Sequence, residues 1–441
     1  MAQRRKKPVP QGEFSADIAD LAHDGRGIAR VDGKVTFIHG ALPGERVRYR
    51  LTQVSRDVDE GEIIAIEVAS PDRVAPGCAH FGTCGGCTLQ HFVPSAQIAF
   101  KQKALLDALV RIGGVVPEEI AAPVTGPIWN YRRRARLGVK LVPKKGGVLV
   151  GFRERDSSLL AALESCPVLD ARVGTKLKPL ASLFGSLSIA GQIPQLEVSG
   201  ADHVALVMRV LIDPTPADLD ALRAFAAEHD FDLYLQRGGP DTLAPLTAVR
   251  PLHYSPDGSR LSLAFGPADF VQINGELSQK MVRQALAWLA PKPNDAVLEL
   301  FAGLGNFTAP LAATGAQVTA LEGEAALVAR GRENLRRNGL HANFLRADLF
   351  APEPQAEWLR RRYDLALLDP PRSGAKEILP HVVASGVQRI VYVSCHPGTL
   401  ARDAGELVKV HGYRLVRAGV LDMFPHTAHV ESMALFVKGS C

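Results

Sequence analysis

The sequence predicts a multidomain α/β protein with a small N-terminal β-barrel, a central α+β region and a C-terminal doubly wound domain of Rossmann type. Its 441 residues are too many for one compact core. The first part reads as short strands separated by turn signals. The last part alternates strand-length apolar runs with amphipathic helices. Together these observations indicate two or three domains.

The first part, residues 9–70, has turn signals at Asp24-Gly25, Asp32-Gly33 and Pro43-Gly44. The stretches between them, such as Lys34–Ile38, alternate in polarity. Regular short strands of this kind predict a five-stranded barrel, a scaffold that often binds oligonucleotides.

The central region, residues 71–265, begins with a cysteine-bearing loop and then mixes helices with strands. We expect helices over Ala96–Ile112 and Pro216–His229, and strands over Ala135–Val142, Val148–Arg153 and His203–Leu211.

The last part, residues 266–441, alternates strands with helices such as Glu324–Asn338. This alternation predicts a mainly parallel sheet, whose ligands bind beyond the carboxyl ends of the strands. The expected strands are Ala296–Leu300, Gln317–Leu321, Asp364–Leu368, Arg389–Ser394 and one near Met433–Val437.

Charge and hydropathy bear on partners and location. The formal net charge is +5, and basic residues gather at Arg4–Lys7, at Arg132–Arg134 with Arg136, and at Lys144-Lys145. Three such groups favour a nucleic-acid partner, although each alone is also typical of a solvated face. The basic start is not followed by an apolar stretch, and no apolar run approaches the roughly 20 residues of a membrane span. We therefore expect a cytoplasmic protein.

A candidate cofactor site begins where an apolar strand enters the glycine turn Phe301–Thr308 and then a helix. The next strand ends in Glu322, whose carboxylate suits ribose hydroxyls. Thr308 stands where a dinucleotide-binding turn has its last glycine, so a ligand with a sulfonium and an amino acid tail fits better. Asp348 is a candidate for holding adenine, and the alternative is that it caps a helix.

Cys395 is the candidate nucleophile, because it lies where a buried strand meets its loop rather than inside the apolar run, as a core cysteine would. Addition of a thiolate to C6 of uracil makes C5 nucleophilic enough to attack an electrophilic methyl group. Glu431 is the candidate base for the C5 proton, the alternative being a solvated carboxylate at a strand start. Asp369 would orient the uracil, which must be flipped out or unpaired.

Two other functions are compatible with parts of this pattern. Asp369-Pro370-Pro371 alone is also typical of methyltransferases that act on amino groups of adenine or protein, and these need neither the thiol nor the base. The second alternative is an RNA-binding or cluster-bearing regulatory protein with an inactive methyltransferase half.

Four cysteines predict a metal or cluster site, and inert free thiols are the alternative. Their spacing, Cys78-x5-Cys84-x2-Cys87 with Cys166 followed by proline, leaves zinc and iron–sulfur open. No role is evident for Cys441.

These motifs resemble the RNA 5-methyluridine methyltransferases over nearly the whole chain. The resemblance implies Cys395 as nucleophile, Glu431 as base and S-adenosylmethionine as methyl donor. The matching segments are Asn130–Arg136, Phe270–Asn274, Phe301–Thr308, Asp369–Arg372, Ser394–Pro397 with Thr399–Asp403, and His429–Ser432. The implied cofactor positions are Gln272, Phe301, Asn306, Glu322, Asp348 and Asp369.

The N-terminal part of the chain indicates which branch of the family the protein resembles. Residues 9–70 look like a TRAM domain, and with the cysteine cluster they resemble the branch of the family that methylates 23S ribosomal RNA. A tRNA or another rRNA uridine is the alternative substrate. The resemblance implies a structural 4Fe-4S cluster on Cys78, Cys84, Cys87 and Cys166, and no membrane or protein partner. His396 departs from the asparagine more usual in the family, and a charged imidazole there would raise the thiolate content of Cys395.

Overall fold

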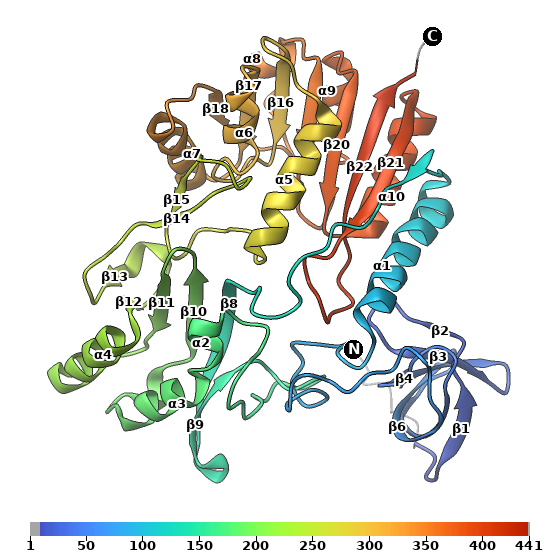
Figure 1. Cartoon of the computed structure of the whole chain (residues 1–441), viewed down its shortest axis with the longest axis vertical. Helices are drawn as coiled ribbons and strands as arrows, with labels where there is room; N and C mark the ends of the chain where they lie inside the picture. Colours follow the sequence, from blue (N-terminus) through green and yellow to red (C-terminus); the bar gives the residue numbers. More distant parts are fainter. Residues whose placement is uncertain (1–8, 440–441) are drawn as a thin grey trace. The chain divides into compact units, whose positions relative to one another are not determined.

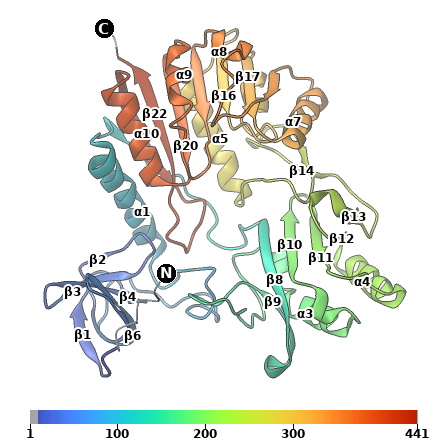
Figure 2. The ribbon, with the colours of Figure 1, turned by 180° about the vertical axis from the view of Figure 1, so that it is seen from behind.

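The computed structural model describes residues 9–439, which divide into two compact units (Figures 1 and 2). Unit 1 contains the chain up to Lys101 together with Arg153–Ser158 and Phe424–His429, and unit 2 contains the remainder. The basic group Arg4–Lys7 and Cys441 lie outside the described residues. The expected division into 9–70, 71–265 and 266–441 stays a prediction.

Unit 1 is built on a six-stranded sheet in the order β1-β5-β6-β4-β3-β2, in which only the β4–β6 pair is parallel. The sequence predicts five strands, and the sixth is the two-residue strand β2. The strands are β1 Phe14–Asp17, β2 Asp20–Leu21, β3 Gly27–Val31, β4 Lys34–His39, β5 Arg46–Val54 and β6 Val58–Val68.

Alternation of polarity along these strands puts one face of the sheet into an apolar core. Ile38, Val47 and Tyr49 are almost fully buried there. A Cβ atom at Gly61 would lie 2.6 Å from the Tyr49 ring, so only glycine lets β6 pass over it.

Unit 2 contains a first sheet in the order β13-β12-β11-β10-β8-β9, followed by the hairpin β14–β15. The expected strands and the expected helix α4 are present, and a capping box of Thr215 and Asp218 starts α4. The elements are β8 Arg134–Val142, β9 Gly147–Gly151, α2 Ala171–Gly174, α3 Leu177–Ser186, β10 Gln195–Gly200, β11 Val204–Arg209, α4 Pro216–His229, β12 Phe231–Gln236, β13 Leu243–Pro245, β14 Leu252–Tyr254 and β15 Leu263–Phe265. Single 3-10 turns occur at η2 Pro143–Lys145, η3 Ala190–Gln192 and η4 Pro240–Thr242.

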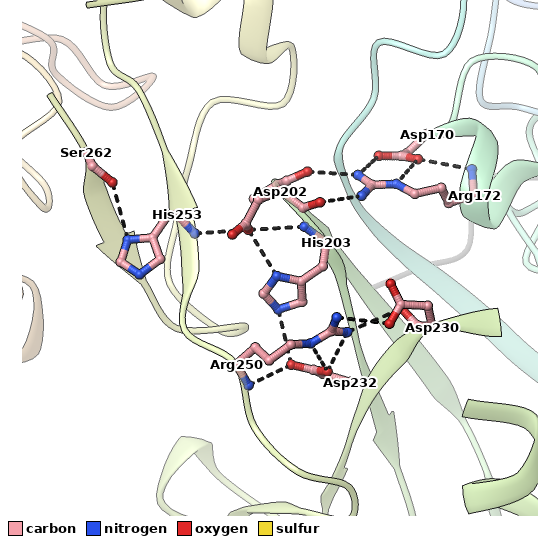
Figure 3. A network of polar contacts seen from close by, with 10 residues as sticks. Asp170, Arg172, Asp202, His203, Asp230, Asp232, Arg250, His253 and Ser262 are labelled. Carbon is pink, nitrogen blue, oxygen red and sulfur yellow. Dashed lines mark hydrogen bonds and ion pairs between the residues drawn. The ribbon is translucent and has the colours of Figure 1, made fainter. Parts of the chain in front are cut away.

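A polar network ties the chain leading into β14 to this sheet (Figure 3). His203 lies between two carboxylates, with Nδ1 3.0 Å from Asp202 and Nε2 3.1 Å from Asp232. The guanidinium of Arg250 lies 2.8 Å from Asp232, and the main-chain N–H of His253 donates to Asp202 over 3.3 Å. One end of the entering segment is therefore held by the buried Asp232 and the other by the exposed Asp202.

The second sheet of unit 2 has the order β18-β17-β16-β19-β20-β22-β21-β7. Strands β16 to β20 are parallel, as predicted, whereas β22 is antiparallel to both of its neighbours, because β21 and β22 follow each other without a crossover helix. The strands are β7 Glu119–Ile120, β16 Ala296–Leu300, β17 Gln317–Glu322, β18 Asn343–Arg346, β19 Leu365–Leu368, β20 Arg389–Ser394, β21 Tyr413–Leu421 and β22 Glu431–Lys438.

Helices connect these strands, and helix α10 begins two residues after Cys395. Its Gly405 meets Gly113 of the π-turn η1, Leu109–Gly113, and a Cβ on either glycine would lie within 2.7 Å of backbone atoms of the other segment. The helices are α1 Pro94–Ala108, α5 Gly275–Leu289, α6 Thr308–Ala313, α7 Ala325–Arg337, α8 Glu357–Arg360, α9 Leu379–Ala384 and α10 Pro397–Lys409.

Candidate active site

The glycine turn between β16 and α6 has the backbone that the sequence predicts. Gly303 and Gly305 have φ of +58° and +101°, a region that glycine enters without strain. Phe301 has φ +63°, a conformation that costs a side-chain-bearing residue about 1–2 kcal/mol. Such strain at a strand end is typical of a functional turn.

Two expected cofactor residues are fixed to this turn or beside it. Glu322, at the end of β17, accepts from the Gly303 N–H over 2.9 Å. Asn306 accepts from the Tyr254 hydroxyl over 3.2 Å. A third, Gln272, accepts through its main-chain oxygen from Arg133 Nε over 2.8 Å. All three side chains are half-buried, and thus partly open to a ligand.

Asp348 is exposed, and its carboxylate accepts from the N–H groups of Phe350 and Ala351 at 2.9 and 3.2 Å. These contacts close a turn and do not cap a helix, because the next helix, α8, begins only at Glu357. The ring of Phe350, which is 45% exposed, lies 5.9 Å from that of Phe301. These two aromatic rings offer an apolar surface next to Asp348.

Glu299 is a site residue to which the sequence interpretation gave no role. It lies in β16 among apolar neighbours and is fully buried. Thr308 lies beside it, but neither carboxylate oxygen has a hydrogen-bond partner of good geometry in the described part of the chain. Burial, together with the charges of Asp369 and Glu322, raises the pKa of Glu299 to about 8.

The register of two strands brings Cys395 and Glu431 together. Ser394 of β20 pairs with Ser432 of β22 in antiparallel fashion, so one further step sets Cys395 opposite Glu431. The Ser432 hydroxyl donates to the Ser394 carbonyl over 3.3 Å and holds this end of the ladder. Two residues that are 36 positions apart in sequence thus become neighbours.

Asp369 completes a group of three acids with these two residues. Burial raises the pKa of Asp369 to about 7, and burial plus the charge of Asp369 raises that of Glu431 to about 8. Burial and the charges of Glu431 and Asp369 raise the pKa of the Cys395 thiol to about 11, with Arg372 acting in the opposite direction. A cation bound beside these groups would favour their ionised forms.

His396 has a structural task next to Cys395. It is the N-cap of α10, and its Nδ1 accepts from the Thr399 N–H over 3.2 Å. In this contact Nδ1 acts as an acceptor, which is the role it has in a neutral imidazole with its proton on Nε2. A charged His396 that raises the thiolate content of Cys395 stays a prediction.

The basic group that begins at Arg132 is not a solvated face. Arg133 and Arg134 are half-buried, and Arg134 donates to the carbonyls of Pro267 and Ala268, both over 3.0 Å. Arg136 is exposed and lies 3.0 Å from Glu197. Lys144 and Lys145 are exposed in the turn η2, as expected for a charged surface.

Three of the expected cluster ligands lie in unit 1, and Cys166 lies in unit 2. Burial raises the pKa of the Cys84 thiol, the hydrogen bond from the Gly86 N–H opposes this, and the charge of Cys78 adds to the rise. The Gly86 N–H donates to Cys84 Sγ over 3.4 Å. Among residues 9–439, no three His, Cys, Asp or Glu side chains gather as they do around a metal ion. The cluster thus stays a prediction.

Three family models match parts of the chain. One described as tRNA (Uracil-5-)-methyltransferase covers residues 355–439, the segment with Asp369, Cys395 and Glu431. A TRAM domain model covers 13–64, and a ribosomal RNA adenine dimethylase model covers 273–358, which includes the glycine turn but not the thiol.

Curated relatives match over the full length. Proteins named 23S rRNA (uracil(1939)-C(5))-methyltransferase RlmD are 51% identical in Alkalilimnicola ehrlichii, with 99% of both chains covered, and 48% identical in Methylococcus capsulatus, with 98% of this chain and 99% of the other covered. Among solved structures, the Pyrococcus abyssi tRNA (uracil-54, C5)-methyltransferase in complex with S-adenosyl-L-homocysteine has a TM-score of 0.73 at 23% identity, covering 96% of this chain and all of that one. That likeness confirms the fold, including the Rossmann-like part. Among the described helices, none has the length and apolar character needed to cross a bilayer.

Proposed function

The chain belongs to the RlmD family of 23S rRNA (uracil-C5)-methyltransferases, and on that premise we propose that it methylates C5 of a uridine in 23S ribosomal RNA with S-adenosylmethionine as methyl donor. The relatives' names give the target as uracil 1939, and we propose the same nucleotide here. The observation that carries the chemistry is the Ser394–Ser432 pair at the end of the β20–β22 ladder, which brings the adjoining Cys395 and Glu431 close enough for the Glu431 charge to act on the thiol. A protein with this substrate works where ribosomes assemble, in the cytoplasm.

The proposed reaction begins with Cys395. Its sulfur forms a bond to C6 of the uracil, and the ring electrons move to C5 and O4 as an enolate. C5 then takes the methyl group from the sulfonium, whose sulfur keeps the electron pair of the broken bond. Glu431 removes the C5 proton, and the returning electrons expel the Cys395 thiolate and restore the ring.

The raised pKa values of Cys395 and Glu431 are consistent with the order in which charges form in the proposed reaction. Unliganded, the site favours a neutral thiol and a neutral Glu431, because three acids share a half-buried space. The substrate's sulfonium adds a positive charge there and so favours the thiolate when both substrates are present. Water and free electrophiles thus meet a protonated Cys395.

The cofactor positions proposed are those expected from sequence, together with Phe350, whose ring lies beside that of Phe301. Glu322 suits the ribose hydroxyls, while the Phe301 and Phe350 rings suit the adenine, with Asp348 beside them. Gln272, Asn306 and Asp369 then face the amino acid and sulfonium end. The amide contacts of Asp348 would have to be shared with the ligand.

We also propose a 4Fe-4S cluster on Cys78, Cys84, Cys87 and Cys166. In support, the first two thiols interact electrostatically, and the Gly86 N–H already donates to Cys84 Sγ, a contact that stabilises a ligating thiolate. The cluster would supply a fixed cross-link rather than electrons, since methyl transfer is redox-neutral. Iron and sulfide near four per chain support it, and stoichiometric zinc without iron contradicts it.

The test of the proposed function is hydrogen release from C5. Full-length protein is incubated with S-adenosylmethionine and 23S rRNA carrying 5-tritiated uridine. We expect one tritium released per methyl incorporated, and none with Cys395→Ala. Methyl transfer to adenine without tritium release would contradict the proposal, and turnover on tRNA alone would contradict the rRNA substrate.

A further inference from the structure

Arg133 carries a positive charge that the protein does not neutralise. Its Nε donates to the Gln272 carbonyl, its guanidinium carbon lies 4.6 Å from the centre of the Tyr254 ring, and its Nη2 is buried without a hydrogen-bond partner. In the described part of the chain, no carboxylate lies within ion-pair distance of it. Desolvation accordingly lowers the pKa of Arg133. A guanidinium that is removed from water without a negative partner is energetically unfavourable, and an anion bound beside it would stabilise it.

The same arginine is attached to two expected cofactor residues. It holds Gln272 through the main chain, and through Tyr254 it supports Asn306. Tyr254 follows His253 in the chain, and the main-chain N–H of His253 is held by Asp202 in the network of Figure 3, so the backbone leading into Tyr254 is fixed. Burial raises the pKa of Tyr254 to about 12, and its hydroxyl therefore stays a donor to Asn306.

The start of α5 adds further donors at this place. Gly275, the first residue of α5, has no side chain, and Arg133 Nη1 occupies the space where one would lie, 3.2 Å from an ideal Cβ. The Asn274 oxygen caps the Leu277 N–H, while Asn274 Nδ2 is buried with no partner among the described residues. The positive end of the 15-residue helix α5 thus lies beside two donors without partners, Arg133 Nη2 and Asn274 Nδ2. The nearby Glu276 is exposed and lies 2.9 Å from Lys280, so it does not supply the anion.

We propose that Arg133 binds the carboxylate of the methionyl part of S-adenosylmethionine. The inference rests on the proposed function, because it takes that molecule as the ligand of Gln272 and Asn306. The methionyl carboxylate is the one anionic group of this ligand, and a planar guanidinium matches a carboxylate better than any other cation does. A phosphate of the RNA is the competing anion, and the test separates the two.

The test compares two ligands that differ in the amino acid tail. S-Adenosylhomocysteine has the carboxylate, and 5′-methylthioadenosine has the same adenosine and thioether without it. We measure binding of both to the full-length protein and to Arg133→Met by calorimetry. The variant should bind S-adenosylhomocysteine about 10- to 100-fold more weakly and methylthioadenosine as the unchanged protein does. Arg133→Lys should bind S-adenosylhomocysteine with an affinity between those of the unchanged protein and Arg133→Met. Arg136→Met, which changes an exposed arginine of the same group, is the matched control.

Three results would overturn the inference. Equal weakening of both ligands would mean that Arg133 only supports the pocket. Unchanged binding of S-adenosylhomocysteine together with weaker, less salt-dependent RNA binding would assign Arg133 to a phosphate. If Arg133→Met does not fold, Arg133→Lys is measured in its place. Full affinity of Arg133→Lys for S-adenosylhomocysteine would contradict a two-pronged contact between the guanidinium and the carboxylate. Failure of the unchanged protein to bind either ligand would instead contradict the proposed function.

Discussion

The antiparallel ladder of β20 and β22 ends at the pair Ser394–Ser432, and Cys395 and Glu431 each directly adjoin one residue of that pair. The ladder fixes the backbone beside the proposed nucleophile and the proposed base, so their spacing should be kept when surrounding loops move. The base also stays buried and poorly solvated, which raises its pKa into the range where proton removal at neutral pH is effective. Position and basicity therefore have one structural origin.

The first prediction concerns the pH dependence of methyl transfer. In the proposed mechanism Cys395 and Glu431 act in their ionised forms, and in the unliganded site their pKa values are raised to about 11 and about 8. The rate at subsaturating substrate, which reports the unliganded enzyme, should therefore rise with pH through about 8 and should show no decline up to pH 9. Rapid-quench measurement of methylated RNA checks this. A rate that is flat between pH 6 and pH 9 would be inconsistent with these two roles.

The second prediction concerns stability. The folded pKa of Glu299 is about 8 against 4.5 for a solvated carboxyl, so its stabilising contribution is complete below 4.5 and is lost as pH rises to about 8. Glu299→Gln does not titrate. The unfolding free energy of the variant minus that of the unchanged protein should therefore increase by on the order of 1 kcal/mol per pH unit across this window. Urea unfolding at pH 5 and pH 8 measures the gain, with the exposed Glu324→Gln as control. An identical difference at both pH values would refute it.

The third prediction concerns Asp403, which is fully buried in α10. Its carboxylate accepts from the Tyr392 hydroxyl over 2.7 Å and from the Ala375 N–H over 2.8 Å, and it pairs with Arg402. Asp403→Ala should cost about 3–5 kcal/mol of unfolding free energy, because it leaves the buried Tyr392 hydroxyl and the Ala375 N–H without their acceptor and removes a buried carboxylate from its network. Tyr392→Phe should cost only about 1–2 kcal/mol. Chemical denaturation of both variants decides, and equal costs would show that Asp403 is not the centre of this network.

The fourth prediction concerns His396. Asparagine is a strong N-cap, so His396→Asn should keep both stability and methyl transfer. His396→Ala should lose about 1 kcal/mol, because the Thr399 N–H loses its acceptor. Unfolding curves and single-turnover rates check the pair. A large fall in rate for His396→Asn with unchanged stability would mean that the imidazole takes part in the chemistry.

Much of this site could be predicted from sequence, and the reasons are physical. Cys395, Glu322 and the glycine turn lie at strand ends, and strand ends are visible as the limits of apolar runs. The antiparallel insertion of β22 was not predicted, because order and direction of strands depend on connections rather than on periodicity. The place of Glu431 before an apolar strand nevertheless predicts its role as the base, and that role stays a prediction.

Other residues gave no usable signal. Arg133 sits in a basic run that reads as a surface patch, and only the structure shows that it turns inward onto Tyr254. Tyr254 itself lies in a three-residue strand without a motif. Glu299 interrupts an apolar run, and that interruption was the one available clue to a buried carboxyl.

The covalent mechanism is tested most directly by Glu431→Gln with S-adenosylmethionine and 23S rRNA. If Cys395 adds to C6 and Glu431 only removes the C5 proton, methyl transfer proceeds once and the adduct persists. We expect a stable, stoichiometric protein–RNA species on a denaturing gel, carrying the labelled methyl group, and no such species with Cys395→Ala combined with Glu431→Gln. Multiple turnovers by Glu431→Gln without any adduct would contradict the assignment of these two residues.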